Sequence, residues 1–531
     1  MLNLLLFSCA RVGAPNGGTR DSLAPKFLGS NIDTTRLNVS RTVKELRLDF
    51  DEYVMLKDFN KNFNVSPPIK KIKKVIPSNL ANKYVLIQWE DTLQANTTYN
   101  FNFGNAIVDN NESNPLPYFN FAFSTGDKID DLFVSGTVKD AMTLIKENQT
   151  AKDNKMVVGL YKAGENLDYK QKPDYITKVD EENYFELNFL PKGEFVIIAF
   201  DDENQNSVYD AGKEKVSFLK EKITLDSTSV RGLKLKLYPS KKVVKYKESK
   251  AINGGLLMTF EGNPETVEVK SLSEELKDFK VTHAKRSDSV NIWFDAEKSN
   301  LGGTVSKQVK LSYFTPTISD TISVSYKAVK DEFKLSNEAG NLIAPENNFV
   351  INTSLPIENL NTSSWKLESD SIAQDFTAKI SEKNPFKILV NSSFKPTKKY
   401  VLTIPKETVS SYYSSNDKSF QFQFEIDKPE NYGSFTAVIK NKPTAKFWVE
   451  LTNEKGEILY SQFTNESEIS FKNLKPATYI ARIRVDNNGN GFWDEADFAQ
   501  NIAAEDVYIF EKEINVRPLW EIKEDWELIN H

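Results

Sequence analysis

Hydrophobic and polar residues alternate in short runs along most of this chain. Phe119, Phe121 and Phe123 alternate with small or polar residues, and residues 420–426 repeat this pattern with three more phenylalanines. A period of two places alternate side chains on one face of a strand, so each set is predicted to face a core. Elsewhere, short runs of Val, Ile, Thr, Tyr and Phe are separated by Asn, Asp, Ser, Gly and Pro, which is typical of strands and turns. The pattern predicts an all-β fold.

The chain also contains an internal repeat. Residues 185–210 and 469–494 align without a gap at a constant offset of 284 (469 − 185). The matched pairs are Leu190 and Leu474, Phe195 and Tyr479, Asp202 and Asp486, Asn204 and Asn488, Asn206 and Asn490, Tyr209 and Trp493, and Asp210 and Asp494. In each copy an alternating strand and a polar turn come first, and a strand running into a polar loop comes last. We predict two copies of one small antiparallel β-sandwich.

A second kind of module accounts for much of the remaining chain. Residues 93–127 and 394–427 each contain a strand, a polar turn, and a closing strand with three alternating phenylalanines. Strand-like runs between about residues 240 and 335 predict a further sandwich. With 531 residues, the chain is long enough for several domains.

The repeated segments resemble transthyretin-like, or carboxypeptidase-regulatory-like, β-sandwich modules. The segments that end in alternating phenylalanines resemble bacterial Ig-like domains of the S-layer-protein type, as does the strand "ELRLDFDEYVMLKDF". The resemblance implies a tandem array of about five Ig-like and transthyretin-like sandwiches after a lipidated N-terminal tether. The predicted boundaries are 1–8 for a lipoprotein signal remnant, 9–22 for the lipidated tether, 23–127 for an Ig-like domain, 128–238 for a transthyretin-like sandwich, 239–330 for an Ig-like sandwich, 331–428 for an Ig-like domain, and 429–531 for a transthyretin-like sandwich with a C-terminal strand.

The first nine residues, "MLNLLLFSC", resemble the end of a bacterial lipoprotein signal, with Leu6, Ser8 and Cys9 at positions −3, −1 and +1 of a lipobox. This resemblance implies cleavage before Cys9 and covalent lipid on that residue, so the protein would be anchored to a membrane by acyl chains. The alternative is a hydrophobic N-terminus with a buried cysteine. Together with "RPLWEIKEDWELIN" near the C-terminus, the whole chain resembles Ig-like-domain-containing outer-membrane lipoproteins of Bacteroidota. That family implies a lipid-anchored position at the cell surface or the periplasmic face.

Charge and composition exclude several functions. The chain has 68 Lys and Arg against 74 Asp and Glu, a net charge of −6, which argues against a nucleic-acid partner. The only histidines are His283 and His531, and Cys9 is the only cysteine, so intrachain disulfides and Cys/His metal clusters are excluded. Ser-His or Cys-His catalysis would have to use His283, which has no partner pattern around it. The composition predicts that the protein is not an enzyme.

The polar loop of the second copy carries oxygen-bearing residues at the spacing of an EF-hand calcium loop. Positions 1, 3, 5, 6, 7, 9 and 12 are occupied by Asp486, Asn488, Asn490, Gly491, Phe492, Asp494 and Asp497. Carboxylates, amide oxygens and the position-7 carbonyl are ligands that Ca²⁺ prefers, and glycine at position 6 permits the sharp turn. We predict a structural calcium site there.

The loop of the first copy is a weaker candidate. Its matching residues are Asp202, Asn204, Asn206, Val208 and Asp210. Ser207 replaces the glycine, and Lys213 stands at position 12, where a cation is unfavourable unless Glu214 or Asp201 substitutes. The alternative for both loops is a polar turn in which Asp and Asn cap their own backbone.

Two functions remain open from the sequence. The first is a scaffold or protein-binding subunit of an outer-membrane complex. The alternative is a surface carbohydrate- or ligand-binding lipoprotein that uses exposed aromatic residues around Trp448 or around Tyr412 and Tyr413. Lysines in residues 67–75 predict a protected edge strand, and residues 521–530 predict a strand closing the last sandwich or a tail that docks on a partner.

Overall fold

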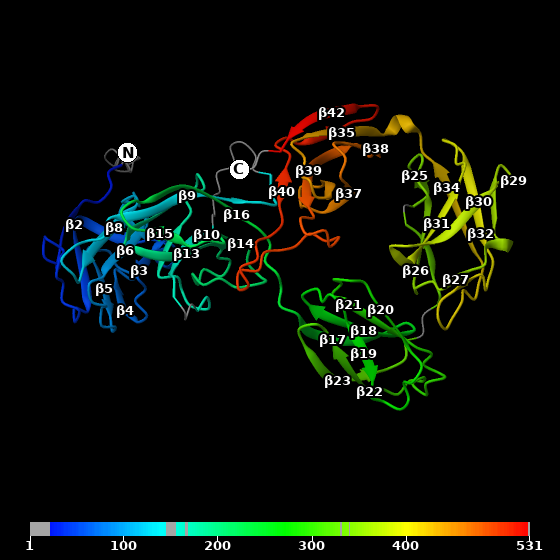
Figure 1. The fold of residues 1–531 in the computed structure, drawn as a ribbon, viewed down its shortest axis with the longest axis horizontal. Coiled ribbons are helices and arrows are strands. Elements are labelled where there is room, and N and C mark those ends of the chain that lie inside the picture. The colour runs from blue at the N-terminus through cyan, green and yellow to red at the C-terminus, as the bar shows by residue number, and fades with distance from the viewer. Residues whose placement is uncertain (1–21, 145–154, 165–167, 330–331, 339, 529–531) are drawn as a thin grey trace, which may run out of the picture. The chain divides into compact units, whose positions relative to one another are not determined.

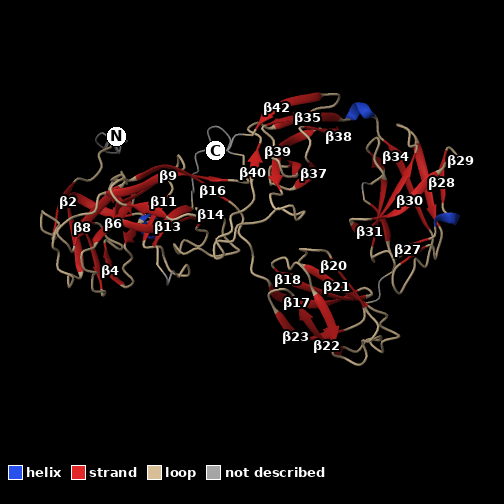
Figure 2. Ribbon diagram, in the orientation of Figure 1, coloured by secondary structure: helices blue, strands red, loops and turns tan. Residues whose placement is uncertain are grey.

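The computed structural model describes residues 22–144, 155–164, 168–329, 332–338 and 340–528. Strands dominate these residues (Figure 2), and the helical elements among them are α1 (Phe59–Asn62) and two short 3₁₀ turns, Thr362–Ser364 and Pro429–Asn431. The predicted all-β array of tandem sandwiches is confirmed. Cys9, the signal remnant and nearly all of the tether lie outside the described residues.

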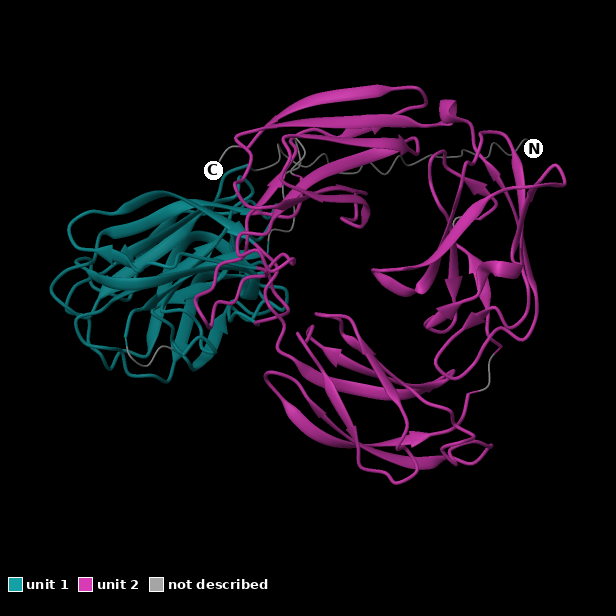
Figure 3. Ribbon diagram, turned by 45° about the vertical axis from the view of Figure 1, so that its right-hand side comes forward, with its two compact units in different colours: residues 1–139, 150–210, 216–237 teal, residues 140–149, 211–215, 238–531 magenta. Residues whose placement is uncertain are grey.

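The chain forms two compact units (Figure 3). One comprises residues 1–139, 150–210 and 216–237, and the other comprises residues 140–149, 211–215 and 238–531. The first unit contains two hydrophobic cores and the second contains three, and the cores follow one another along the chain from blue to red in Figure 1.

The first core lies between a sheet of order β1-β2-β5-β4, to which β7 adds, and a sheet of order β3-β6-β8. Its strands are β1 (Phe27–Ser30), β2 (Glu45–Leu56), β3 (Asn64–Ser66), β4 (Ile72–Ile76), β5 (Asn82–Trp89), β6 (Thr98–Gly104), β7 (Ile107–Asp109) and β8 (Phe119–Ser124). Phe121 and Phe123 are buried in this core and Phe119 packs against it, as the alternation predicts. Strand β4, with exposed Lys73 and Lys74, is a sheet edge, which confirms the lysine-protected edge.

The second core lies between sheets of order β11-β10-β13-β14 and β12-β9-β16, with β15 also pairing with β13. Its strands are β9 (Leu132–Asp140), β10 (Met156–Lys162), β11 (Tyr175–Lys178), β12 (Tyr184–Leu190), β13 (Gly193–Asp201), β14 (Val216–Phe218), β15 (Ile223–Leu225) and β16 (Val230–Leu237).

The third core lies between sheets of order β17-β18-β21-β20 and β19-β22-β23. Its strands are β17 (Lys245–Ile252), β18 (Gly255–Glu261), β19 (Glu268–Ser271), β20 (Lys280–His283), β21 (Ser289–Trp293), β22 (Lys307–Phe314) and β23 (Ser319–Tyr326).

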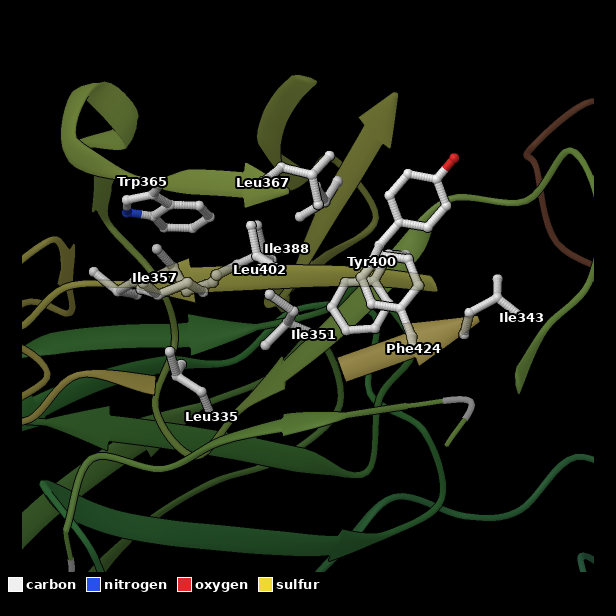
Figure 4. Packing of buried hydrophobic residues seen from close by; sticks show 14 of the residues in the cluster. Leu335, Ile343, Ile351, Ile357, Trp365, Leu367, Ile388, Tyr400, Leu402 and Phe424 are labelled. Atoms are coloured by element: carbon white, nitrogen blue, oxygen red, sulfur yellow. The ribbon is translucent and has the colours of Figure 1, made fainter. Parts of the chain in front are cut away.

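The fourth core lies between sheets of order β24-β26-β31-β30 and β25-β34-β32-β28-β29, with a small β27-β33 pair. Its strands are β24 (Leu335–Asn337), β25 (Leu342–Ile343), β26 (Phe349–Thr353), β27 (Asn359–Leu360), β28 (Lys366–Ser369), β29 (Ile372–Ala373), β30 (Phe376–Ser381), β31 (Asn384–Ser392), β32 (Lys399–Ile404), β33 (Val409–Ser410) and β34 (Phe420–Ile426). Tyr400 and Phe424 stack inside it with ring centroids 5.6 Å apart (Figure 4). Trp293 of the third sandwich also packs into this core, so the two sandwiches share apolar contact.

The fifth core lies between sheets of order β37-β36-β39-β40 and β38-β35-β42, with β41 also pairing with β39. Its strands are β35 (Gly433–Lys440), β36 (Phe447–Thr452), β37 (Ile458–Thr464), β38 (Glu468–Leu474), β39 (Ala477–Val485), β40 (Val507–Ile509), β41 (Ile514–Val516) and β42 (Glu521–Glu527). Strand β42 runs parallel to β35 and buries Trp526, so the acidic C-terminal segment closes the sandwich.

The second and fifth sandwiches repeat the same strand order. Adding 284 to the bounds of β12 and β13 gives the bounds of β38 and β39 without any shift. The register also repeats, because Ile198 faces Gly159 in one copy and Arg482 faces Glu450 in the other. The internal repeat of the sequence is therefore a structural duplication, and its two polar loops leave equivalent strands.

Candidate functional site

The polar loop of the fifth sandwich begins where β39 ends. The carboxylate of Asp486 is 3% exposed and accepts hydrogen bonds from the backbone N–H groups of Asn490 and Gly491, both at 3.0 Å. The side-chain amides of Asn488 and Asn490 both donate to one oxygen of Asp494, at 2.5 and 2.8 Å. The loop thus brings together the side chains of Asp486, Asn488, Asn490 and Asp494.

Asp497 does not join that group. It forms a bridge with Ile502 in a separate turn, where its carboxylate accepts the backbone N–H of Gln500 at 3.2 Å. Glu505 lies against the loop instead, accepting the backbone N–H groups of Asn488 and Asp494 at 3.1 and 2.9 Å. Glu505 is 6% exposed. The spacing of a twelve-residue calcium loop does not point to Glu505, because this residue lies 19 residues after Asp486 (505 − 486).

The pKa values of two carboxylates at this loop, Glu505 and Asp494, shift in opposite directions. Removal from water raises the pKa of Glu505 above its ordinary value. Burial alone would raise the pKa of Asp494 too, but hydrogen bonds from Asn488 and the contact with Arg286 outweigh it, so the pKa of Asp494 is lowered. Asp494 therefore stays ionised to a lower pH than an ordinary aspartate, whereas Glu505 takes up its proton at a higher pH than an ordinary glutamate.

The loop of the second sandwich repeats most of these internal hydrogen bonds. Asp202, 4% exposed, accepts from the backbone N–H groups of Asn206 and Ser207 at 3.0 and 3.1 Å. The amide of Asn204 donates to Asp210 at 2.6 Å, as Asn488 does to Asp494. Val208 donates its backbone N–H to the side-chain oxygen of Asn206 at 2.6 Å. Burial raises the pKa of Asp202, and these backbone hydrogen bonds only partly offset it.

The two loops differ in the residues that hold the left-handed backbone. Gly489 and Gly491 have φ of 72° and 82°, whereas Gln205 and Ser207 hold the equivalent positions at 58° and 61°. A side chain with a Cβ in this region costs about 1–2 kcal/mol relative to glycine. The first loop is therefore the more strained copy of one turn.

Replacing Ser207 by glycine is expected to stabilise the second sandwich by about 0.5–1 kcal/mol, because relief of the left-handed strain exceeds the added entropy of the unfolded chain. Replacing Gly491 by serine should destabilise the fifth sandwich by a similar amount. Both changes can be followed by thermal unfolding of the full chain. A lower midpoint for the Ser207→Gly protein would contradict this assignment of strain.

The loop of the fifth sandwich also contacts the third sandwich. Arg286 lies in the turn between β20 and β21, and its guanidinium bonds Asp494 at 2.7 Å and Glu265 at 2.6 Å. The same guanidinium lies over the ring of Phe492, 4.7 Å from its centroid, and the ammonium of Lys285 lies 5.0 Å from that centroid. The two residues predicted to supply positions 7 and 9 of a calcium loop therefore also join two sandwiches.

Replacing Arg286 by alanine is expected to lower the free energy of unfolding by about 1–2 kcal/mol at neutral pH, because a partly buried charge-assisted pair is lost. The pKa of Asp494 is lowered in the folded protein, so this stabilisation is present above the ordinary aspartate pKa of 3.8. It is lost as the pH falls through the lower, folded value. The difference in stability between the two proteins should therefore be full at pH 6 and should shrink progressively as the pH falls below 3.8 toward the lower, folded pKa of Asp494. A constant difference across that range, or an equal effect from Lys285→Ala, would contradict the pairing.

A buried ion-pair network lies on the face of the β37-β36-β39-β40 sheet that points away from the core. Glu450 is completely buried, and one of its oxygens accepts two hydrogen bonds from Arg482, at 2.9 and 2.7 Å. Its other oxygen accepts two from Arg484. The equivalent residues of the second sandwich are Gly159, Ile198 and Phe200, so the duplicated face is apolar in one copy and charged in the other.

The aromatic residues predicted as ligand platforms make contacts within the chain. Trp448 stacks on Phe463 with centroids 4.4 Å apart, and the guanidinium of Arg484 lies 5.9 Å from the indole. The ammonium of Lys280 lies 4.4 Å from the ring of Tyr412. Tyr413 donates its hydroxyl to Asp278 at 3.3 Å. Burial, with the nearby charge of Asp278, raises the pKa of Tyr413 to about 12.

The described residues contain no group of three or more His, Cys, Asp or Glu side chains placed to hold a metal ion. His283 forms a hydrogen bond with the backbone oxygen of Ser287 at 3.0 Å. Of the helices in the described part of the chain, none is both long and apolar enough to cross a membrane.

Comparison with known proteins identifies one domain of the chain. Residues 21–125 match the family described as bacterial Ig-like domain. No curated protein matches the chain.

The solved structures that match this chain superpose on it poorly. The surface layer protein SbsC, domains 1-6, is 12% identical over 93% of this chain and 67% of its own, with a TM-score of 0.16. The mixed-linkage glucan utilization locus protein SGBP-B of Bacteroides ovatus, in complex with a heptasaccharide, is 10% identical over 74% of this chain and 97% of its own, with a TM-score of 0.21. The major pilin subunit BcpA of Bacillus cereus is 11% identical over 75% of this chain and 99% of its own, with a TM-score of 0.13. At these values none of the three carries an argument about the function of this chain.

Proposed function

We propose that the chain is a non-enzymatic, lipid-anchored protein of the outer membrane, and that its β-sandwiches act as a scaffold or protein-binding subunit of an envelope complex. The observation that carries this proposal is that the aromatic residues predicted as ligand platforms instead contact other residues of this chain. Tyr412 and Tyr413 of the fourth sandwich meet Lys280 and Asp278 of the third, and Trp448 lies between Phe463 and Arg484. These side chains stabilise neighbouring strands and sandwiches, which supports a structural role.

The chemistry of the described residues supports a role without catalysis. A hollow in the third sandwich is lined by Glu274, Glu275, Lys277, Asp278, Asp295, Lys298, Ser299 and Asn300. It contains neither a histidine nor a cysteine, and none of its carboxylates forms the base–nucleophile pair that covalent catalysis requires. The Ig-like match over residues 21–125 also fits a domain used for binding or spacing.

The scaffold role is tested by affinity purification of the full chain from solubilised envelopes, where a partner should be recovered at fixed stoichiometry.

The membrane anchor is tested by a separate labelling experiment. In cells fed a clickable palmitate analogue, the protein should be labelled and should sediment with membranes, whereas Cys9→Ser should lose the label and become soluble. Retention of the label in the Cys9→Ser protein would contradict lipidation at that residue.

We also propose that the loop at Asp486 binds Ca²⁺ as a structural ion. Asp486, Asn488, Asn490 and Asp494 would supply side-chain oxygens, and Phe492 would supply a carbonyl, as the spacing of an EF-hand loop requires. Glu505 is a buried carboxylate that lies against the same loop, and it would take the role that Asp497 was predicted to have. The ion would hold these oxygens together and stiffen the loop. The loop at Asp202 is the weaker site, since Lys213 follows it.

One observation favours a second candidate function, binding of a carbohydrate or similar ligand. A hollow of about 460 Å³ in the fifth sandwich is lined by Ala477, Thr478, Asn515, Val516, Arg517 and Trp520. The indole of Trp520 is 48% exposed, and Arg517 lies 4.9 Å from its centroid. An exposed aromatic face beside polar groups is a surface on which a sugar ring can stack. Retention on a glycan array that is lost in Trp520→Ala would support this candidate, and absence of retention would reject it.

A further inference from the structure

Strand β37 is an exposed and uncharged sheet edge. It pairs with β36 on one side, and no other strand among the described residues pairs with it. Its sequence, ILYSQFT, contains no charged residue and no proline. Ile458, Leu459 and Phe463 are 45%, 49% and 45% exposed. Natural proteins normally protect such edges, because unpaired N–H and C=O groups attract another strand.

Three other edge strands among the described residues carry that protection. Strand β4 reads IKKVI, β17 reads KYKESKAI and β42 reads EIKEDWE, so each places charges along its free edge. Strand β37 lacks the feature although it is seven residues long and largely exposed.

The second sandwich, which is the other copy of the duplicated module, has an equivalent edge strand, β11. Strand β11 pairs with β10 in the register that β37 uses with β36, and Ser461 takes the position of Ile176. Ile176 is 6% exposed, and its backbone N–H points away from β10 and donates to the hydroxyl of Ser66 in the first sandwich at 3.3 Å. Because the registers match, the backbone N–H of Ser461 also points away from its own sheet. The outer edge of β11 in the second sandwich is therefore covered by the first sandwich, whereas the outer edge of β37 in the fifth sandwich is exposed.

We propose that β37 pairs with β37 of a second copy of this chain, antiparallel, about a two-fold axis at Ser461. This axis places Leu459 of each copy opposite Phe463 of the other, so the exposed apolar side chains cover one another. The outward N–H and C=O groups of Ser461 bond to those of Ser461 in the second copy. No like charges oppose each other, because the strand has none.

The second copy is the occupant that these observations favour. An isologous contact requires a surface that is complementary to itself, and an uncharged strand with apolar residues two positions either side of its centre satisfies this. A single seven-residue strand pair buries less than a standard interface, so the dissociation constant should be on the order of 1–100 µM. Membrane anchoring of both copies would raise their effective concentration. The inference goes beyond the proposed function, since a scaffold need not self-associate.

Sedimentation velocity of the full chain tests the inference, with Cys9→Ser to exclude disulfide dimers. The Cys9→Ser protein should change from monomer to dimer as its concentration rises through the micromolar range. Leu459→Lys and Phe463→Glu should each weaken the dimer at least tenfold, because each places an unpaired charge against an apolar side chain. Mixed in equal amounts, the two variants should form a heterodimer, since the introduced lysine of one copy then faces the introduced glutamate of the other and the native Leu–Phe pair is kept.

A third variant separates loss of pairing from loss of folding. Ser461→Pro removes an N–H that points away from the sheet, a position where an edge strand tolerates proline. It should keep the thermal midpoint of the wild type and remain monomeric. A wild type that stays monomeric at the highest concentration, a Ser461→Pro protein that dimerises normally, or a variant mixture that does not recover the dimer would overturn the inference.

Discussion

Replacement of Glu450 by alanine is expected to lower the free energy of unfolding of the fifth sandwich by about 3–5 kcal/mol, because it leaves two guanidinium groups without their shared carboxylate. Glu450 is completely buried, and the side chain of Arg482 is 8% exposed. Four of the seven tryptophans (Trp448, Trp493, Trp520 and Trp526) lie in this sandwich, so urea unfolding followed by fluorescence reports mainly on it.

Two controls distinguish loss of the buried Glu450 network from the effect of removing any carboxylate. Glu468→Ala removes an exposed pair with Lys523, 2.8 Å long, and should cost less than about 1 kcal/mol. Adding Arg482→Ile to Glu450→Ala should recover part of the loss, because isoleucine occupies the equivalent position, Ile198, in the other copy. A cost below about 1 kcal/mol for Glu450→Ala would mean that the network contributes no more than a surface pair.

Replacement of Asp486 by alanine should have the next largest effect, about 2–4 kcal/mol, because two partly buried backbone N–H groups lose their acceptor. These are the N–H groups of Asn490 and Gly491, each 3.0 Å from the carboxylate. The same change should abolish any rise in thermal midpoint produced by calcium. In the unchanged protein, calcium at a hundred times its dissociation constant should add about 2.7 kcal/mol.

A matched pair of variants tests whether Glu505 or Asp497 contributes to the proposed calcium binding. Glu505→Gln should weaken the response to calcium, since Glu505 lies against the loop. Asp497→Asn should leave the response nearly unchanged, because Asp497 lies in a separate turn with Ile502. Identical melting of the unchanged protein in calcium and in chelator would reject the metal site and leave the loops as self-capped polar turns.

Much of the fold could be predicted from the sequence because it depends on local pattern. Alternation places Phe121 and Phe123 in the first core, and charges along residues 521–527 accompany a strand that closes the last sandwich. The repeat at an offset of 284 identifies equivalent strands because β12, β13, β38 and β39 keep their lengths, turns and buried positions. The spacing of the two loops likewise predicts the side chains that meet around Asp486 and Asp202.

The contacts that join distant segments could not be predicted in the same way. Arg286 reaches Asp494 across more than 200 residues, and nothing in either local pattern indicates the other. Glu505 meets the loop through the insertion between β39 and β40, which the first copy lacks at that length. The Glu450 network did leave a sequence signal, since Arg482 and Arg484 alternate with apolar residues in β39, but a period of two alone does not identify their partner.

The most direct test of the proposed scaffold role is the mass and composition of the native complex. The full chain, purified from outer membranes in mild detergent, should elute with a stoichiometric protein partner, and light scattering should give a mass above that of one or two copies of this 60.4 kDa chain. Recovery of the chain alone, as a monomer or self-paired dimer that a glycan array retains, would contradict the scaffold role and favour the ligand-binding alternative.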